Sequence, residues 1–128
     1  MKEKILIVED NHQNMRLMEM VLGAKNYTLL RATDGEEALD IAVRERPDLI
    51  MMDLRLPKIG GLEVTRKLRQ MPDFGHVPII AVTAYAMKSD EEKAIEAGCD
   101  AYLSKPINTR ELPGLVAEML SQRQKDNA

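Results

Sequence analysis

Acidic side chains follow two short apolar runs of this chain, and their type and position could support chemistry. Leu49-Ile50-Met51-Met52 ends in Asp53, and Ile5-Leu6-Ile7-Val8 ends in Glu9 and Asp10. Apolar runs this short are typical of strands that are buried on both faces. A carboxylate at the end of such a strand is unfavourable unless it faces an opening, a cation or a reaction. We therefore expect the three carboxylates to meet at one edge of a parallel sheet.

Two other polar residues follow the later apolar runs. Thr83 closes Ile79-Ile80-Ala81-Val82, and Lys105 follows Ala101-Tyr102-Leu103-Ser104. Because close carboxylates repel, a divalent cation is expected among them, and an all-oxygen ligand set favours Mg²⁺, with Mn²⁺ as an alternative. A metal ion, an ammonium and a hydroxyl around one carboxylate supply the opposing charge and the donors that phosphoryl transfer requires. Asp53 is then the candidate nucleophile, and it would become an acyl phosphate.

The elements that position these residues alternate between strand and helix along the whole chain. We expect strands over 4–9, 27–32, 49–53, 79–83 and 101–104, and helices over 11–23, 34–46, 61–69, 89–97 and, at the end, through 112–120. Such units imply an α/β fold with a parallel sheet covered by helices on both faces, in which ligands bind at the carboxyl ends of the strands. Pro113 is awkward inside the last helix, so that helix either starts near Pro113 or has an irregular first turn.

Size and composition indicate an ordinary globular domain. The chain has 128 residues, which we divide into one domain over 1–120 and a polar C-terminal tail over 121–128. Its net charge of −3 gives no support for binding nucleic acid. No apolar stretch is long enough to span a membrane, and no signal peptide is expected. Cys99 is the single cysteine, which is typical of a cytoplasmic protein without disulfides.

Six segments stand in the order and spacing of one known family. They are Ile5–Asn11, Ala32–Leu39, Pro47–Asp53, Leu56-Pro57 with Gly61, Pro78–Ala84 and Ala97–Pro106. On these segments, from about Lys2 to Leu120, the chain resembles the receiver domain of bacterial two-component response regulators. It looks most like the stand-alone, single-domain type found among chemotaxis and cell-cycle regulators. The resemblance implies a flavodoxin-like, doubly wound sheet of five parallel strands in the order 2-1-3-4-5, with five helices in a single domain.

The resemblance implies a role for each residue at the strand ends. Asp53 would be the phosphoacceptor, forming 4-aspartylphosphate. Glu9 and Asp10 would hold Mg²⁺ together with Asp53 and the backbone carbonyl of Arg55. Lys105 would pair with the phosphoryl group as the positive member of the catalytic set.

Further residues are implied to read out and time the phosphorylated state. Thr83 would follow the phosphoryl group, and the ring of Tyr102 would turn inward as the second switch residue. The Lys105–Pro106 peptide bond is expected to be cis. Arg55 and Tyr85 would flank the path of attacking water, and the bulk of Tyr85 predicts a longer-lived acyl phosphate.

The implied function is a phosphorelay switch rather than an enzyme. The domain would accept a phosphoryl group from a phosphohistidine on a sensor histidine kinase or a histidine phosphotransfer protein, and would assist its own phosphorylation and dephosphorylation. Output would be contact with a downstream protein target, as a monomer or a phosphorylation-dependent dimer, because no DNA-binding or enzymatic domain is expected after residue 120. Neither nucleic acid nor membrane is an expected partner. The alternative is a receiver domain cut from a hybrid histidine kinase or a multidomain regulator, a type that the run Thr83–Met87 also resembles.

Other functions fit the residues less well. A haloacid-dehalogenase-type phosphatase would need a second aspartate where Arg55 stands, and a nucleotide-binding domain would need a glycine-rich phosphate loop after a strand. A degenerate receiver used only for docking would not need the complete acidic set.

Two segments depart from the family pattern. No acidic or amide residue precedes the second glycine of Lys58-Ile59-Gly60-Gly61, which implies a looser loop, and Pro113-Gly114 interrupts the usual start of the last helix.

Overall fold

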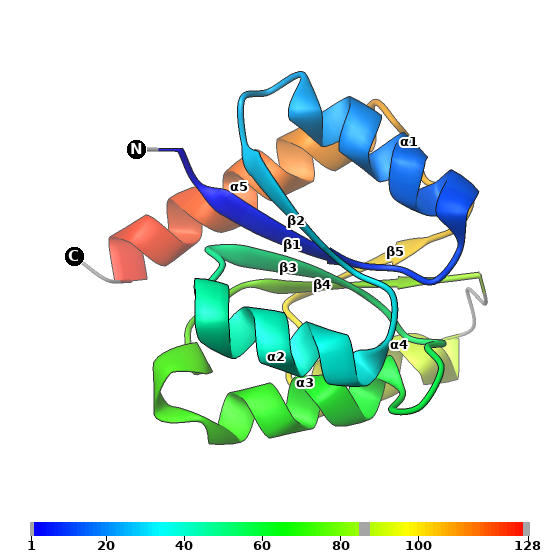
Figure 1. The fold of residues 1–128 in the computed structure, drawn as a ribbon, viewed down its shortest axis with the longest axis vertical. Helices are drawn as coiled ribbons and strands as arrows, with labels where there is room; N and C mark the ends of the chain where they lie inside the picture. The colour runs from blue at the N-terminus through cyan, green and yellow to red at the C-terminus, as the bar shows by residue number, and fades with distance from the viewer. Residues whose placement is uncertain (1, 85–87, 127–128) are drawn as a thin grey trace.

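The computed structural model describes residues 2–84 and 88–126, with side chains up to residue 123, and these residues form an α/β sandwich. The strands are β1 (Lys4–Val8), β2 (Thr28–Ala32), β3 (Leu49–Asp53), β4 (Ile79–Thr83) and β5 (Ala101–Ser104). The helices are α1 (His12–Gly23), α2 (Gly35–Glu45), α3 (Gly61–Gln70), the short 3₁₀ helix η1 (Pro72–Phe74), α4 (Lys88–Ala97) and α5 (Glu111–Asp126). All strand pairs are parallel, and the order β2-β1-β3-β4-β5 confirms the expected flavodoxin-like topology (Figure 1).

Helices cover both faces of the sheet, so the central strands are buried on both sides. In Figure 1, α1 and α5 lie on one face, and α2, α3 and α4 lie on the other. Along β1, Ile5 and Ile7 pack with α1 and α5, whereas Leu6 and Val8 pack with α2 and α3. This alternation follows from the two-residue repeat of a strand. Among the described residues, none of these helices has both the length and the apolar character needed to cross a lipid bilayer.

Local side-chain contacts set the helix ends. The side chain of Asn11 accepts a hydrogen bond from the amide of Asn14 and so caps α1, and Asp34 caps α2 in the same way through the amide of Glu37. α5 begins at Glu111, two residues before Pro113. The first turn of a helix has amide groups without intrahelical partners, so a proline there removes no hydrogen bond. The helix therefore starts slightly before Pro113 rather than at it.

The segment expected as a polar C-terminal tail begins inside α5. α5 continues to Asp126, so residues 121–126 of that segment are helical. Arg123 on this last part of the helix forms an ion pair with Asp48, the residue before β3. Asp48 also accepts a hydrogen bond from the main-chain amide of Lys4, at 2.8 Å. Through Asp48, the extension of α5 is thus attached to the amino-terminal ends of the adjacent strands β1 and β3.

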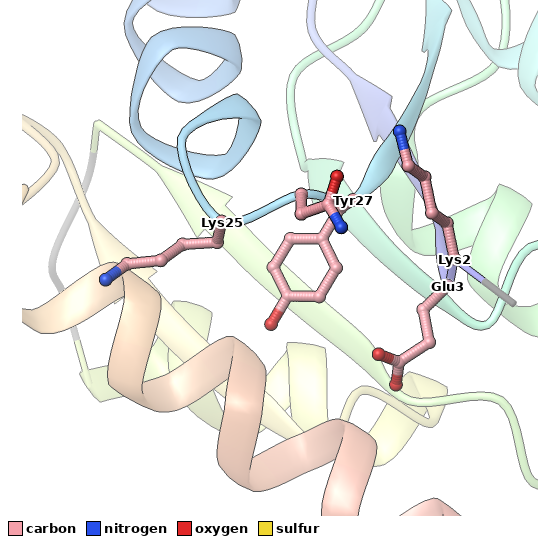
Figure 2. A pocket seen from close by; sticks show the side chains of 5 residues that line it. Lys2, Glu3, Lys25 and Tyr27 are labelled. Atoms are coloured by element: carbon pink, nitrogen blue, oxygen red, sulfur yellow. The ribbon is translucent and has the colours of Figure 1, made fainter.

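A hollow of about 430 Å³ lies at this amino-terminal edge, lined by Lys2, Glu3, Lys25, Asn26 and Tyr27. Figure 2 shows the ammonium groups of Lys2 and Lys25 on opposite sides of the Tyr27 ring. The positive charges therefore do not converge on a common point. The ring of Tyr27 packs against the apolar cluster under α1 and α5. None of the residues that line the hollow is one that the sequence predicts to be functional.

Candidate functional site

The carboxyl ends of β1, β3 and β4 bring three predicted site residues to one edge of the sheet. Val8 pairs with Met52, so the next residues, Glu9 and Asp53, stand at the same level on adjacent strands. Thr83 ends β4 on the other side of β3. The exposed fractions of Glu9, Asp53 and Thr83 are only 1%, 4% and 2%. The three residues therefore lie together at the carboxyl edge of the sheet, which is where the strand-end rule expects them.

Three carboxylates form the acidic part of the site. Glu9, Asp10 and Asp53 each present an oxygen, and these oxygens all lie within 4.8 Å of one another. Glu9 and Asp53 are buried, whereas Asp10 is exposed, so the cluster opens to solvent on the Asp10 side. An all-oxygen donor set of this size suits a hard divalent cation such as Mg²⁺. A cation there would also relieve the repulsion between the carboxylates.

Lys105, the residue directly after β5, contacts two of these carboxylates. Its Nζ atom lies 2.8 Å from Glu9 Oε1 and 3.1 Å from Asp53 Oδ2, and its side chain is 15% exposed. Within the described residues, Glu9 Oε1 is buried and makes no hydrogen bond of good geometry, so its contact with Lys105 is mainly electrostatic. The main-chain amide of Lys105 donates to the carbonyl of Thr83 at 2.7 Å, and the Lys105–Pro106 bond is cis. Lys105 thus provides the positive charge beside the buried Glu9 Oε1 and the neighbouring Asp53 Oδ2.

Main-chain amides orient the two buried carboxylates. The amide of Arg55 donates to Asp53 Oδ1 at 3.0 Å, and the amide of Asn11 donates to Glu9 Oε2 at 3.1 Å. Each carboxylate accepts from the residue two positions further on, as in an Asx-type turn. Sequence reasoning missed both contacts, although an acid at a strand end followed by a turn was the available signal. These bonds hold the carboxylates at the strand ends and leave Asp53 Oδ2 facing Lys105.

The charges of the site shift two pKa values. Burial raises the pKa of Glu9 from 4.5 to about 7, and the neighbouring Asp53 carboxyl adds to this rise, whereas Lys105 opposes it. Burial alone would lower the pKa of Lys105, but the adjacent carboxylates of Glu9 and Asp53 outweigh burial and raise it. Lys105 therefore stays charged, and the acidic cluster tends to retain a proton on Glu9 when no metal ion is bound.

The remaining predicted residues lie around this cluster. Tyr102 is half-buried on β5 and packs against the apolar cluster under α2 and α3. Burial raises its pKa, and the acidic residues Asp90 and Glu91 of α4 add to the rise. The side chain of Arg55 is exposed, in the loop that follows β3. Tyr85, predicted to shield an acyl phosphate, lies outside the described residues.

The arrangement is suited to transfer of an anionic group to Asp53. One Asp53 oxygen faces an ammonium, the other is held by an amide, and an acidic cluster able to bind a cation adjoins both. A moving phosphoryl group would therefore meet positive charge on two sides once a cation is bound. Thr83 stands at the end of β4, the strand next to β3.

Comparisons with known proteins agree over nearly the whole chain. The profile of a family described as response regulator receiver domain matches residues 5–117. The polar-differentiation response regulator DivK of Brucella anthropi is 50% identical over 108 residues, which make up 84% of this chain and 88% of that protein.

Solved structures give the same result. The receiver domain of a sensor histidine kinase from Pseudomonas aeruginosa is 37% identical with a TM-score of 0.88, over 94% of this chain and 99% of that one; that structure has a magnesium ion coordinated in its active-site cleft. A CheY-like response regulator receiver domain protein from Methanospirillum hungatei is 28% identical with a TM-score of 0.91, over 98% and 99%.

Proposed function

The chain belongs to the response regulator receiver domain family, and on that premise we propose that Asp53 is its phosphoacceptor. The chain is thus a receiver domain of two-component signalling. The observation that supports Asp53 most strongly is its setting: a buried carboxylate with one oxygen 3.1 Å from Lys105 and the other held by the Arg55 amide. The phosphoryl donor is a phosphohistidine on a sensor histidine kinase or a histidine phosphotransfer protein. An Asp53 oxygen forms the new bond to phosphorus, while the bond from phosphorus to the donor nitrogen breaks and that nitrogen keeps the electron pair.

Glu9, Asp10 and Asp53 would hold a Mg²⁺ ion, with the backbone carbonyl of Arg55 as a further ligand. The donor set fits this ion because it consists of oxygens within 4.8 Å of one another and includes the buried Glu9 Oε1. When bound, the ion neutralises the charge that builds up on the transferred group. Lys105, directly after β5, supplies the second positive charge, 3.1 Å from Asp53 Oδ2. Mn²⁺ has the same preference for oxygen ligands.

The switch extends from the site to the surface through β4 and β5. Thr83 and Lys105 move toward the new dianion, and Tyr102 turns inward behind Thr83. Thr83 is buried at the end of β4 and Tyr102 is half-buried on the paired strand β5, and this arrangement on adjacent strands supports the order of events. Such a change is a shift between two states that already exist in equilibrium. The output is contact between residues 1–120 and a downstream protein, as a monomer or as a dimer that forms on phosphorylation.

The domain promotes its own phosphorylation and dephosphorylation but turns over no other substrate. Its compartment is the cytoplasm, in keeping with a free and buried Cys99. The match to DivK over 88% of the length of that regulator favours the response-regulator interpretation over a receiver domain cut from a hybrid kinase. The name of that relative suggests polar differentiation as the process to examine first.

Phosphorylation of Asp53 can be tested directly. We expect incubation with acetyl phosphate and Mg²⁺ to add one phosphate per chain, measured by intact mass, and Asp53→Asn to abolish the addition. Asp73→Asn is the matched control, because Asp73 is an exposed aspartate on η1. Omission of Mg²⁺ should also prevent labelling. A phosphate that still forms on the Asp53→Asn variant would contradict the assignment.

The lifetime of the phosphate tests the role of Tyr85. We expect Tyr85→Ala to accelerate loss of the phosphate, because a smaller side chain would leave the acyl phosphate open to water. The rate is measured from the decay of the phosphorylated mass after the donor is removed. Tyr27→Ala, a change at the opposite edge of the sheet, is the control. An unchanged decay rate in Tyr85→Ala would show that this side chain does not shield the site.

A further inference from the structure

The loop between β3 and α3 lies directly against the first residue of α2. A Cβ atom added to Gly35 would stand 2.3 Å from the carbonyl oxygen of Ile59 and 2.8 Å from its Cβ atom. At distances below 3.0 Å one of the two atoms must move. Two of the Ile59 atoms involved, the carbonyl oxygen and carbon, belong to the main chain, so the loop itself would have to shift. Only a glycine at position 35 therefore lets the loop approach α2 this closely.

Lys58, one residue earlier in the loop, adds a charged contact to the same turn of α2. Its Nζ atom lies 3.6 Å from Asp34 Oδ2 and 3.8 Å from Glu36 Oε2. Its φ angle is 67°, in the left-handed region that glycine and asparagine occupy more readily than lysine. The side chain is 58% exposed, so each ion pair is weak by itself. An unfavourable backbone angle beside two acidic partners indicates that the position of Lys58 is set by the contact with α2.

The other end of the loop is fixed against β3. A Cβ atom on Gly61 would stand 2.3 Å from the carbonyl oxygen of Asp53, and the amide of Gly61 donates to the carbonyl of Leu54 at 3.2 Å. Gly60 precedes α3 without a side-chain cap, as expected for a loop that lacks an acidic or amide residue there. The loop is thus held by close packing at Gly61 and by the contact with α2, in place of a cap. Arg55 lies in the part of the loop between the end of β3 and Lys58.

We propose that Gly35 and Lys58 are positioning residues for the metal site, acting through the loop that carries Arg55. They hold the loop so that the amide of Arg55 stays on Asp53 Oδ1 and its carbonyl stays available to the ion. The first part of this statement rests on the structure alone, and the second rests on the proposed function. Among the described residues, the contacts of Lys58 are with Asp34 and Glu36 and the close neighbour of Gly35 is Ile59, so any effect on the ion is indirect.

The test compares Gly35→Ala, Lys58→Asn and Lys58→Glu with the unchanged protein. Asparagine tolerates the left-handed conformation, so Lys58→Asn removes the charge without adding backbone strain. Gly75→Ala is the control for Gly35→Ala, because a Cβ atom on Gly75 meets nothing within 4 Å. Lys67→Glu, an exposed change on α3, is the control for charge reversal. Glu36→Lys in the Lys58→Glu background restores a pair of opposite charges.

The first measurement is hydrogen exchange of the Arg55 amide without metal. We expect the Arg55 amide to exchange faster in Gly35→Ala and in Lys58→Glu, and slightly faster in Lys58→Asn. The two control variants should exchange at the rate of the unchanged protein. The double variant Lys58→Glu, Glu36→Lys should recover part of the slow exchange that Lys58→Glu loses. The second measurement is Mg²⁺ affinity by titration. Gly35→Ala should weaken it by about tenfold, as loss of outer support does at other metal sites.

The outcomes separate the two proposals. Unchanged exchange at Arg55 in both Gly35→Ala and Lys58→Glu would overturn the positioning role, whatever the metal affinity. Faster exchange with unchanged Mg²⁺ affinity would overturn the part that concerns the ion. Should the unchanged protein itself bind no Mg²⁺, the proposed function fails, while the exchange result still decides whether Gly35 and Lys58 hold the loop.

Discussion

Glu9 combines near-complete burial with a place among like charges. It is 1% exposed, adjoins Asp53, and has one oxygen that makes no well-formed hydrogen bond within the described part of the chain. These conditions raise its pKa to about 7, with burial as the main cause. A carboxylate that a metal ion needs in its ionised form is therefore partly protonated near neutral pH when the ion is absent. Proton and metal ion compete for the same side chain.

The competition at Glu9 predicts a pH-dependent metal affinity. In the folded protein without metal, Glu9 keeps its proton up to about pH 7, whereas the unfolded chain releases it near 4.5. Since the folded state binds more protons in this window, the contribution of Glu9 to stability decreases as the pH rises from 4.5 to 7. The ion displaces the proton, so the apparent Mg²⁺ affinity should increase from pH 6 to pH 8.

Titration of Mg²⁺ at pH 6, 7 and 8 measures this effect. We expect Glu9→Gln to bind the ion more weakly and with less dependence on pH, because the variant has no proton to release at this position. Asp73→Asn, remote and exposed, should keep the dependence of the unchanged protein. An affinity that is equal at pH 6 and pH 8 in the unchanged protein would contradict the raised pKa.

At the scale of elements, Arg69 ties three segments at the amino-terminal edge of the sheet together. From the last turn of α3 its guanidinium donates to the carbonyls of Gly98, Phe74 and Val77, at 2.7–2.9 Å, and to the carboxylate of Asp100 at 2.7 Å. The same carboxylate oxygen accepts the amide of Ile79, the first residue of β4. The side chain is 18% exposed, and its bonds to the three carbonyls are partly buried, whereas the bond to Asp100 is exposed.

Loss of this arginine should therefore destabilise the fold without touching the acidic site. Arg69→Ala leaves buried carbonyls without donors and should lower the free energy of unfolding by about 2–4 kcal/mol. Arg69→Lys should recover only part of the loss, because an ammonium cannot reproduce the planar fork of donors. Arg66→Ala, an exposed change on the same helix, is the control. Urea unfolding measures the difference, and equal midpoints for Arg69→Ala and Arg66→Ala would disprove the role.

The sequence predicted the elements well where local signals decide them. Strands 49–53, 79–83 and 101–104 have the expected bounds, because each is a continuous apolar run that ends in a polar residue. The convergence of Glu9, Asp53 and Thr83 followed from the parallel order of those strands. Contacts between distant segments were not predictable. The partners of Arg69, the contact of Lys58 with α2 and the helical extension to Asp126 depend on tertiary packing, which no local pattern encodes.

At the scale of the molecule, the fold keeps three carboxylates and one ammonium together at one edge of a well-packed sheet. Both faces of that sheet carry apolar clusters, so the surrounding structure can hold the acids close despite their repulsion. Functional sites commonly reduce stability in this way. Without a cation, the negative charge of the three carboxylates exceeds the positive charge of Lys105, even when Glu9 is partly protonated.

Removal of one of these charges should therefore stabilise the protein without metal. Asp53→Asn keeps an oxygen for the Arg55 amide and leaves Lys105 to pair with Glu9, so we expect its free energy of unfolding to rise by about 1 kcal/mol in the absence of Mg²⁺. Added Mg²⁺ should make the unchanged protein the more stable of the two. Its free energy of unfolding should rise by about 2.7 kcal/mol when the free ion is at about 100 times its Kd, whereas that of Asp53→Asn should rise by less.

Urea unfolding of both proteins, with EDTA and with saturating Mg²⁺, tests this reversal. Asp73→Asn again serves as the control and should follow the unchanged protein in both conditions. A variant that is less stable than the unchanged protein even with EDTA would mean that the Asp53–Lys105 ion pair outweighs the repulsion among the acids. The site would then stabilise the empty fold, and Mg²⁺ would not be needed to offset its charge.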